Sequence, residues 1–180
     1  VKPHTIFRGS VESGPAKMLA VGLGKQKSAQ AMHRADLATA IPEAASWLFK
    51  TGKIPLGVAV VENGWGEVAA LEVLTPETWL EAEAQRLKQA WQLYPTLPWE
   101  ELDLLIVERM GKDIAGSGMD MNVIGLERRY PGSGMKLVIG QLIALSLTDA
   151  SKGNGTGVGY ADLVTRQLAD AVDESTTRTN

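Results

Sequence analysis

The sequence of 180 residues contains no cysteine. This absence excludes disulfide bonds, thiolate metal sites and a cysteine nucleophile. It is typical of proteins in a reducing compartment, and we expect a cytoplasmic location. Long apolar runs are missing too, because none reaches the roughly 18 residues that a membrane span requires. The sequence therefore predicts no membrane partner.

An excess of positive charge is also absent. Lys and Arg number 18 against 21 Asp and Glu, and the net charge is −3. The basic surface typical of proteins that bind nucleic acid is therefore not encoded. The apolar share of 44% and the charged share of 22% are those of an ordinary globular protein. A chain of this length can form one domain or two small ones.

Apolar runs, alternating segments and helical periodicities follow one another along the chain and predict the α/β class. We expect a mixed sheet with flanking helices and one hairpin, distributed over parts of two α/β lobes. The near-continuous apolar run at 102–107 is typical of a strand buried on both faces. Strands are expected at 18–22, 56–62, 67–74, 102–107 and 137–147, and helices at 28–40, 42–49, 75–93 and 160–172.

Two glycine-rich turns invite comparison with nucleotide-binding motifs. Gly24-Lys25 does not form a P-loop, because Leu19 stands where the first glycine is needed and Gln26 where Ser or Thr is needed. The glycines of 153–159 alternate and do not fit the dinucleotide fingerprint. Backbone N–H groups in such a turn can still receive a phosphate. One hypothesis is thus a non-catalytic α/β binding module that holds a nucleotide or phosphate at its glycine-rich turns.

The two histidines of the chain flank a lysine near its start. His4 precedes Lys17, and His33 follows Lys17 by sixteen positions. Each residue has an ordinary interpretation when taken alone: a histidine near a terminus, a solvated lysine, and a histidine on an amphipathic helix. The pattern that they form together has a more specific interpretation.

This segment resembles the nickel-dependent lactate racemase family of 2-hydroxyacid racemases and epimerases. That family carries a Pro-His pair, then a Ser-Gly loop with a lysine, then a histidine sixteen positions after the lysine. The resemblance implies that Lys17 attaches covalently to a nickel-pincer cofactor, a pyridinium mononucleotide with two thio-substituted carboxyl arms. It also implies that His33 ligates the nickel and that His4 is one of two catalytic acid/bases. The matching residues are Pro3-His4, Ser13-Gly14, Lys17 and His33.

The implied chemistry agrees with general principles. Racemising a 2-hydroxy acid by hydride loss needs a hydride acceptor, which no side chain provides, so a cofactor must supply it. A histidine is suited to take the hydroxyl proton. Imidazole is a good nickel ligand, and because the cofactor brings its own sulfur and carbon donors, a protein without cysteine can hold it. The family's cofactor-maturation proteins are expected partners.

The resemblance also bears on the extent of the chain. The family's Asp-Asp-x-Thr-Arg-Pro motif, whose arginine grips the substrate carboxylate, and its second catalytic histidine precede the Pro-His pair and are absent here. We therefore expect a middle segment of a longer protein. It would hold the end of the N-terminal, cofactor-attaching lobe at 1–75, and a linker helix with part of the C-terminal lobe at 76–180. Surfaces exposed in such a segment would favour homo-oligomers.

A looser likeness covers 102–122. There a strand is followed by Gly-Lys-Asp and then by Asp-Met-Asn. By this resemblance, Lys112, Asp120 and Asn122 are expected to face the cofactor or the substrate. The identity of the 2-hydroxy acid stays open among lactate, malate, longer hydroxy acids and sugar acids.

Overall fold

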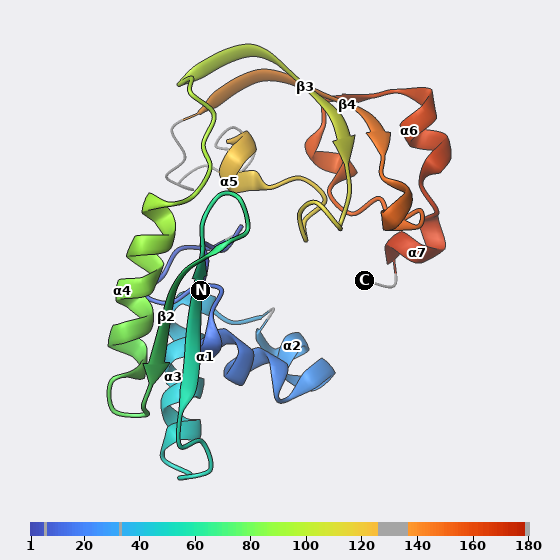
Figure 1. Ribbon diagram of the computed structural model, residues 1–180. Helices are drawn as coiled ribbons and strands as arrows, with labels where there is room; N and C mark the ends of the chain where they lie inside the picture. Colours follow the sequence, from blue (N-terminus) through green and yellow to red (C-terminus); the bar gives the residue numbers. More distant parts are fainter. Residues whose placement is uncertain (6, 33, 126–136, 179–180) are drawn as a thin grey trace. The chain divides into compact units, whose positions relative to one another are not determined.

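The computed structural model describes residues 1–5, 7–32, 34–125 and 137–178. Helices accompany two separate β-sheets, which confirms the α/β class (Figure 1). The chain divides into two compact units, Val1–Pro95 and Thr96–Asn180. Helix α4 (Trp79–Gln92) belongs to the first unit, and the expected division into two lobes at 75/76 stays a prediction. None of the described helices is both long enough and apolar enough to cross a membrane.

The first unit packs helices around a two-stranded antiparallel hairpin (Figure 1). Its buried core joins α3, α4 and both strands, with Ile41, Leu74 and Trp79 at 2% exposure or less. Besides α4, its elements are α1 (Pro15–Lys17), the π-helix η1 (Met18–Gly22), α2 (Lys25–Met32), α3 (Leu37–Phe49), β1 (Gly57–Glu62) and β2 (Val68–Leu74).

The strand expected at 18–22 is wrong, because these residues form the π-helix η1 and continue α1. Pro15 occupies the first helical position, where its fixed φ favours a helix, and the N–H of Met18 donates to the carbonyl of Gly14 at 3.1 Å. Ala20 is buried while Met18 is 69% exposed. A short apolar run does not distinguish a strand from a buried helical turn by periodicity alone.

The helix boundaries at 28–40 and 42–49 are also corrected. Helix α3 begins at Leu37, because the carboxylate of Asp36 accepts the N–H of Ala38 at 3.3 Å and caps the first turn. Pro42 lies inside α3 rather than at the start of a second helix. Helix α4 starts at Trp79, after a turn that follows Thr75, and so begins later than expected.

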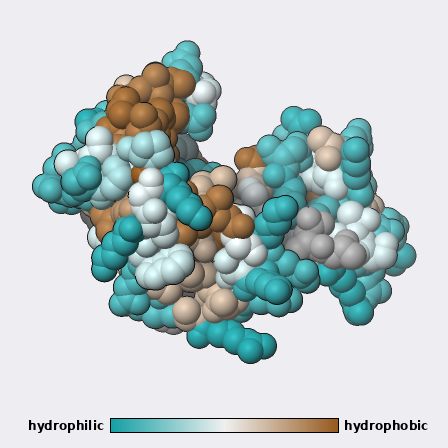
Figure 2. Space-filling model, turned by 90° about the horizontal axis from the view of Figure 1, so that it is seen from below, coloured by the Kyte–Doolittle hydropathy of each residue, from teal (hydrophilic) through white to brown (hydrophobic). Residues whose placement is uncertain are grey.

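The hairpin strands at 56–62 and 67–74 are confirmed as β1 and β2. One of their faces is apolar and exposed: Val58 pairs with Val73, and these side chains are 50% and 64% exposed. Figure 2 shows apolar side chains gathered into a patch on one side of the molecule. Such a surface favours association, so formation of a homo-oligomer stays a prediction.

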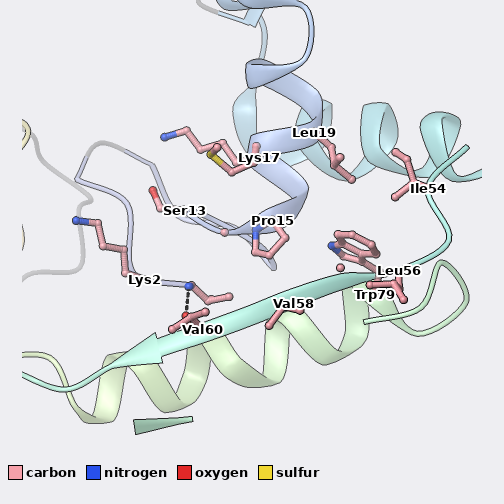
Figure 3. Close-up of a pocket in the computed structure, with 14 residues that line it drawn as sticks. Lys2, Ser13, Pro15, Lys17, Leu19, Ile54, Leu56, Val58, Val60 and Trp79 are labelled. Carbon is pink, nitrogen blue, oxygen red and sulfur yellow. Dashed lines mark hydrogen bonds between the residues drawn. The ribbon is translucent and has the colours of Figure 1, made fainter. Parts of the chain in front are cut away.

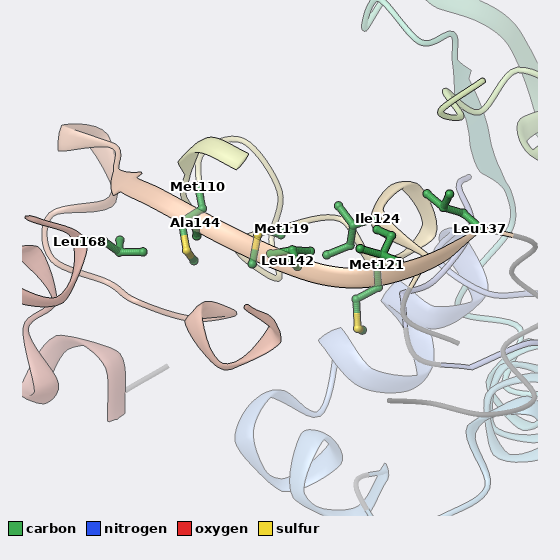
Figure 4. Packing of buried hydrophobic residues seen from close by; sticks show 9 residues of the cluster. Met110, Met119, Met121, Ile124, Leu137, Leu142, Ala144 and Leu168 are labelled. Atoms are coloured by element: carbon green, nitrogen blue, oxygen red, sulfur yellow. The ribbon is translucent and has the colours of Figure 1, made fainter. Parts of the chain in front are cut away.

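The second unit is built on a parallel sheet with the strand order β3-β4-β5. Methionines and aliphatic side chains, among them Met110, Leu142 and Leu168, form its buried core (Figure 4). Its elements are β3 (Glu101–Met110), α5 (Met121–Ile124), β4 (Val138–Leu147), η2 (Asp149–Ser151), η3 (Val158–Tyr160), β5 (Leu163–Val164), α6 (Arg166–Ala171) and α7 (Glu174–Arg178).

Two expectations for this unit are wrong. Strand β3 is not buried on both faces, since Leu104 and Ile106 are 44% and 54% exposed. The helix expected at 160–172 is divided into η3, β5 and α6. Asp162 causes this division, because its carboxylate accepts the N–H of Leu142 at 2.8 Å and holds the segment in extended form beside β4. Thr165 then caps α6 by accepting the N–H of Leu168 at 3.1 Å.

Candidate functional site

A cavity of about 670 Å³ lies in the first unit between the start of α1 and strand β1 (Figure 3). Most of its lining side chains are apolar, including Val58 and Trp79. The polar side chains in its wall are Lys2, Ser13 and Lys17. The cavity therefore combines an apolar floor with the cationic side chains of Lys2 and Lys17.

Lys17 lies at the junction of α1 and η1, on the wall of this cavity. Burial of its half-buried side chain lowers the pKa of the amine, and the positive charge of Lys2 lowers it further. A lowered pKa increases the fraction of neutral, nucleophilic amine. π-Helical turns are frequent at functional sites. Lys17 thus has the local surroundings of a reactive lysine.

His4 is half-buried, and its ring lies against that of Phe7 with the centroids 4.4 Å apart. Burial, followed by the charges of Lys17, Arg8 and Lys2, lowers its pKa to about 4. The imidazole is therefore neutral at pH 7 and able to accept a proton. Lys17 is thus one of the charges that act on His4, although His4 is not among the residues that line the cavity.

Glu12 is a site residue that sequence reasoning missed. Its side chain is 2% exposed, and its Oε2 accepts the backbone N–H of His4 at 2.6 Å. Its Oε1 accepts the N–H of Gly9 at 3.4 Å, and Oε2 lies 3.8 Å from Nη1 of Arg8. Burial raises the pKa of this carboxyl, although these donors oppose the shift. Nothing in the sequence separates Glu12 from the other acidic residues.

Glu83 is the second acidic residue that was missed. It lies on the buried face of α4 and is fully buried. Its Oε2 accepts the N–H of Ala16 at 2.9 Å and Nε1–H of Trp79 at 3.1 Å. Burial raises its pKa. A signal was present in the sequence, because Glu83 falls at helical spacing between the apolar residues Leu80 and Leu87.

The expected nickel ligand, His33, lies outside the described residues. Within the part of the chain that the structure describes, no group of three or more His, Asp or Glu side chains could hold a metal ion.

Lys112, Asp120 and Asn122 lie in the second unit, after the carboxyl end of β3. The backbone N–H of Lys112 donates to Oγ of Ser151 at 3.0 Å. Asp120 caps α5 by accepting the N–H of Asn122 at 2.9 Å, and Asn122 is 4% exposed. These contacts give Asp120 a structural role. A role of the three residues toward a cofactor or substrate stays a prediction.

The glycine-rich turn 153–159 uses several of its amides internally. The N–H of Gly155 donates to Oγ1 of Thr177, and that of Thr156 to Oδ1 of Asn154, each at 3.0 Å. Gly157 allows a close approach, because a Cβ at this position would lie 2.0 Å from the carbonyl oxygen of Ser117. The glycines thus serve loop packing, which weighs against a phosphate cradle at this turn.

We compared the chain with protein-family models, curated proteins and solved structures, and none of them matches it significantly.

Proposed function

We propose that this chain carries the cofactor-attaching site of a nickel-dependent 2-hydroxyacid racemase or epimerase. The observation that carries the proposal is the surroundings of Lys17: a half-buried amine with a lowered pKa, on the wall of a cavity of about 670 Å³, within electrostatic reach of His4. Covalent attachment through a lysine needs a neutral amine beside enough space for the attached group.

The cavity and its residues fit a nickel-pincer pyridinium mononucleotide in size and chemistry. Cofactor sites commonly occupy about 300–1,000 Å³ and combine apolar walls with a few polar groups. The apolar wall formed by Val58 and Trp79 suits a flat ring, and the charge of Lys2 suits a phosphate. When bound, the cofactor supplies the hydride acceptor that no side chain provides. Lys17 would hold it, and His33 would ligate its nickel.

His4 is proposed to move the hydroxyl proton of the 2-hydroxy acid. Its neutral ring can take this proton as the substrate loses hydride and return it when the planar keto acid is reduced again. The pKa of about 4 is set by burial and by nearby cations. An anionic ligand near Lys17 would offset those cations and raise the pKa of His4 toward the range of an effective base.

The test is to produce the protein from its complete coding sequence together with the family's cofactor-maturation proteins. Intact mass, peptide mapping and nickel content are then measured. We expect a mass increase on the peptide that contains Lys17, and nickel close to one per chain. The substitution His33→Ala should remove the nickel.

Lys27→Ala is the matched control, because Lys27 is exposed and lies on the neighbouring helix α2. It should leave both the adduct and the nickel content unchanged. A wild-type protein without adduct and without nickel, under conditions in which a known racemase is loaded, would refute the proposal.

A further inference from the structure

The start of helix α1 lacks the usual local capping group. The N-cap residue is Gly14, which has no side chain to accept a hydrogen bond, and Pro15 has no N–H. The N–H of Ala16 is therefore the first donor of the helix that needs an acceptor. In most helices a Ser, Thr, Asp or Asn at the N-cap supplies one.

Glu83 supplies this acceptor from a different helix. Its carboxylate reaches Ala16 from α4, 67 positions away in sequence, at 2.9 Å. The same oxygen, Oε2, accepts Nε1–H of Trp79 at 3.1 Å, which fixes the direction of the carboxylate. Glu83 and Trp79 lie one helical turn apart on α4, so Trp79 orients the carboxylate that binds the Ala16 N–H. The position of α4 therefore determines the position of the first turn of α1.

The other oxygen of Glu83 explains why residue 14 is glycine. A Cβ on Gly14 would lie 2.2 Å from Oε1 of Glu83. The φ of −154° and ψ of −166° at this position are accessible to alanine, so the close approach, and not the backbone conformation, requires glycine. Oε1 is buried without a hydrogen-bond partner in the described residues, and it faces this glycine.

We propose that Glu83 and Gly14 act together as a positioning pair that fixes the first turn of α1 and thereby sets Lys17 on the cavity wall. The role of Lys17 in this inference rests on the proposed function. Lys17 directly follows Ala16, so displacement of the anchored N–H moves the lysine as well. In Figure 3, Pro15 and Lys17 extend from the same short helical segment above β1, with Trp79 beside it.

The titration of Lys17 reports on this position without any cofactor. Competitive labelling with trace acetic anhydride over a pH series, followed by peptide mass spectrometry, gives the pKa of each lysine in the folded protein. Burial lowers the pKa of Lys17. We expect Glu83→Ala and Gly14→Ala to release the first turn and raise this pKa. Glu83→Gln keeps an acceptor oxygen and should leave it close to the wild-type value.

Glu81→Ala is the matched control, because Glu81 is exposed on the same helix. It should leave the titration of Lys17 unchanged. The double variant Gly14→Ala/Glu83→Ala should melt no lower than Glu83→Ala alone, since the oxygen that the new methyl group would meet is gone. A folded Glu83→Ala protein with the wild-type titration of Lys17 would overturn the proposal.

If Glu83→Ala does not fold, the proposal is tested on two other proteins. These are the Gly14→Ala variant, by its Lys17 titration, and the native protein, by hydrogen exchange at the Ala16 amide. An unchanged Lys17 titration in folded Gly14→Ala contradicts the positioning role. In the native protein the Ala16 amide should be protected from hydrogen exchange although no residue of its own helix accepts it, and exchange at the rate of an open amide also contradicts the role. Absence of a cofactor adduct in the wild type would instead count against the proposed function and leave the labelling result standing.

Discussion

The two units of the chain differ in what shifts the pKa values of their ionisable groups. In the first unit, burial shifts the pKa values of His4, Glu12, Lys17 and Glu83. In the described part of the second unit, two exposed carboxylates, Asp113 and Asp173, have pKa values that are lowered first by hydrogen bonds from Thr148 and Ser175, as hydrogen bonds lower that of the exposed Glu77 in the first unit. Proteins retain buried ionisable groups at a cost in stability, and such groups cluster at functional sites.

The difference also appears in how backbone donors are satisfied. In the first unit, buried carboxylates accept the N–H groups of His4 and Ala16, next to the residues with expected chemistry. In the second unit, Asp120 and Asn154 accept N–H groups two positions away, and the hydroxyl groups of Ser151 and Thr177 accept those of Lys112 and Gly155 from farther along the chain. Buried carboxylates next to His4 and Lys17 are what the proposed function predicts for the first unit.

The largest expected effect is the loss of cofactor attachment. Lys17→Ala should abolish the mass adduct completely, because it removes the half-buried side-chain amine in the cavity wall to which the cofactor is proposed to attach. Lys112→Ala, in the second unit, should keep the adduct. Intact-protein mass spectrometry of both variants, produced with the maturation proteins, checks the contrast. Loss of the adduct in Lys112→Ala would show that the chemistry is shared between the units.

The next effect is on stability, at Glu12. Glu12→Ala leaves the N–H groups of His4 and Gly9 without their acceptor and should lower the free energy of unfolding by about 3–4 kcal/mol. Glu12→Gln keeps one oxygen acceptor and should cost clearly less. Asp113→Ala is the comparison in the second unit, where the carboxylate is exposed and a smaller loss is expected. Urea denaturation followed by circular dichroism measures all three, and equal losses for Glu12→Ala and Asp113→Ala would remove the distinction between the units.

The loop packing of the second unit offers a matched pair of glycines. Gly118 has a φ of +81°, and a Cβ there would lie 1.8 Å from the carbonyl oxygen of Thr156. Gly118→Ala should therefore lower the free energy of unfolding by roughly 2–4 kcal/mol. A Cβ on Gly116 meets no atom within 4 Å, so Gly116→Ala should be nearly neutral. Thermal unfolding distinguishes the two, and similar melting temperatures would contradict the assigned loop contact.

Patterns within short segments of the sequence predicted most of the elements that the sequence analysis identified correctly. Apolar runs and alternating segments predicted the hairpin strands β1 and β2 and the strands β3 and β4. Local patterns failed where a side chain from elsewhere decides the outcome. Asp162 holds an extended segment inside a helical periodicity by binding the backbone of β4, which no local window contains.

The candidate site shows the same limit. Sequence reasoning selected His4 and Lys17, and their roles in a reaction stay a prediction, although the charge of Lys17 contributes to the lowered pKa of His4. It did not select Glu12 and Glu83, because their importance depends on backbone donors that become neighbours only on folding. The apolar neighbours of Glu83 on α4 were the one available signal, since an acid on the buried face of a helix must have partners.

The smallest expected effect is a pH dependence caused by His4. Its pKa is about 4 in the folded protein and about 6.5 in the unfolded chain. Between these values the unfolded chain binds a proton that the folded protein does not, so stability falls as the pH is lowered from 6.5 to 4.

Glu12 and Glu83 contribute with the opposite sign, because their raised pKa values let the folded protein bind more protons than the unfolded chain. The comparison must therefore be between wild type and His4→Gln, in which those carboxyls are common to both proteins. The melting temperature of the wild type minus that of His4→Gln should be constant above pH 7 and decrease steadily between pH 6.5 and 4. A difference that does not change with pH would mean that His4 titrates normally, and the first unit would then lose one of the buried groups that set it apart from the second.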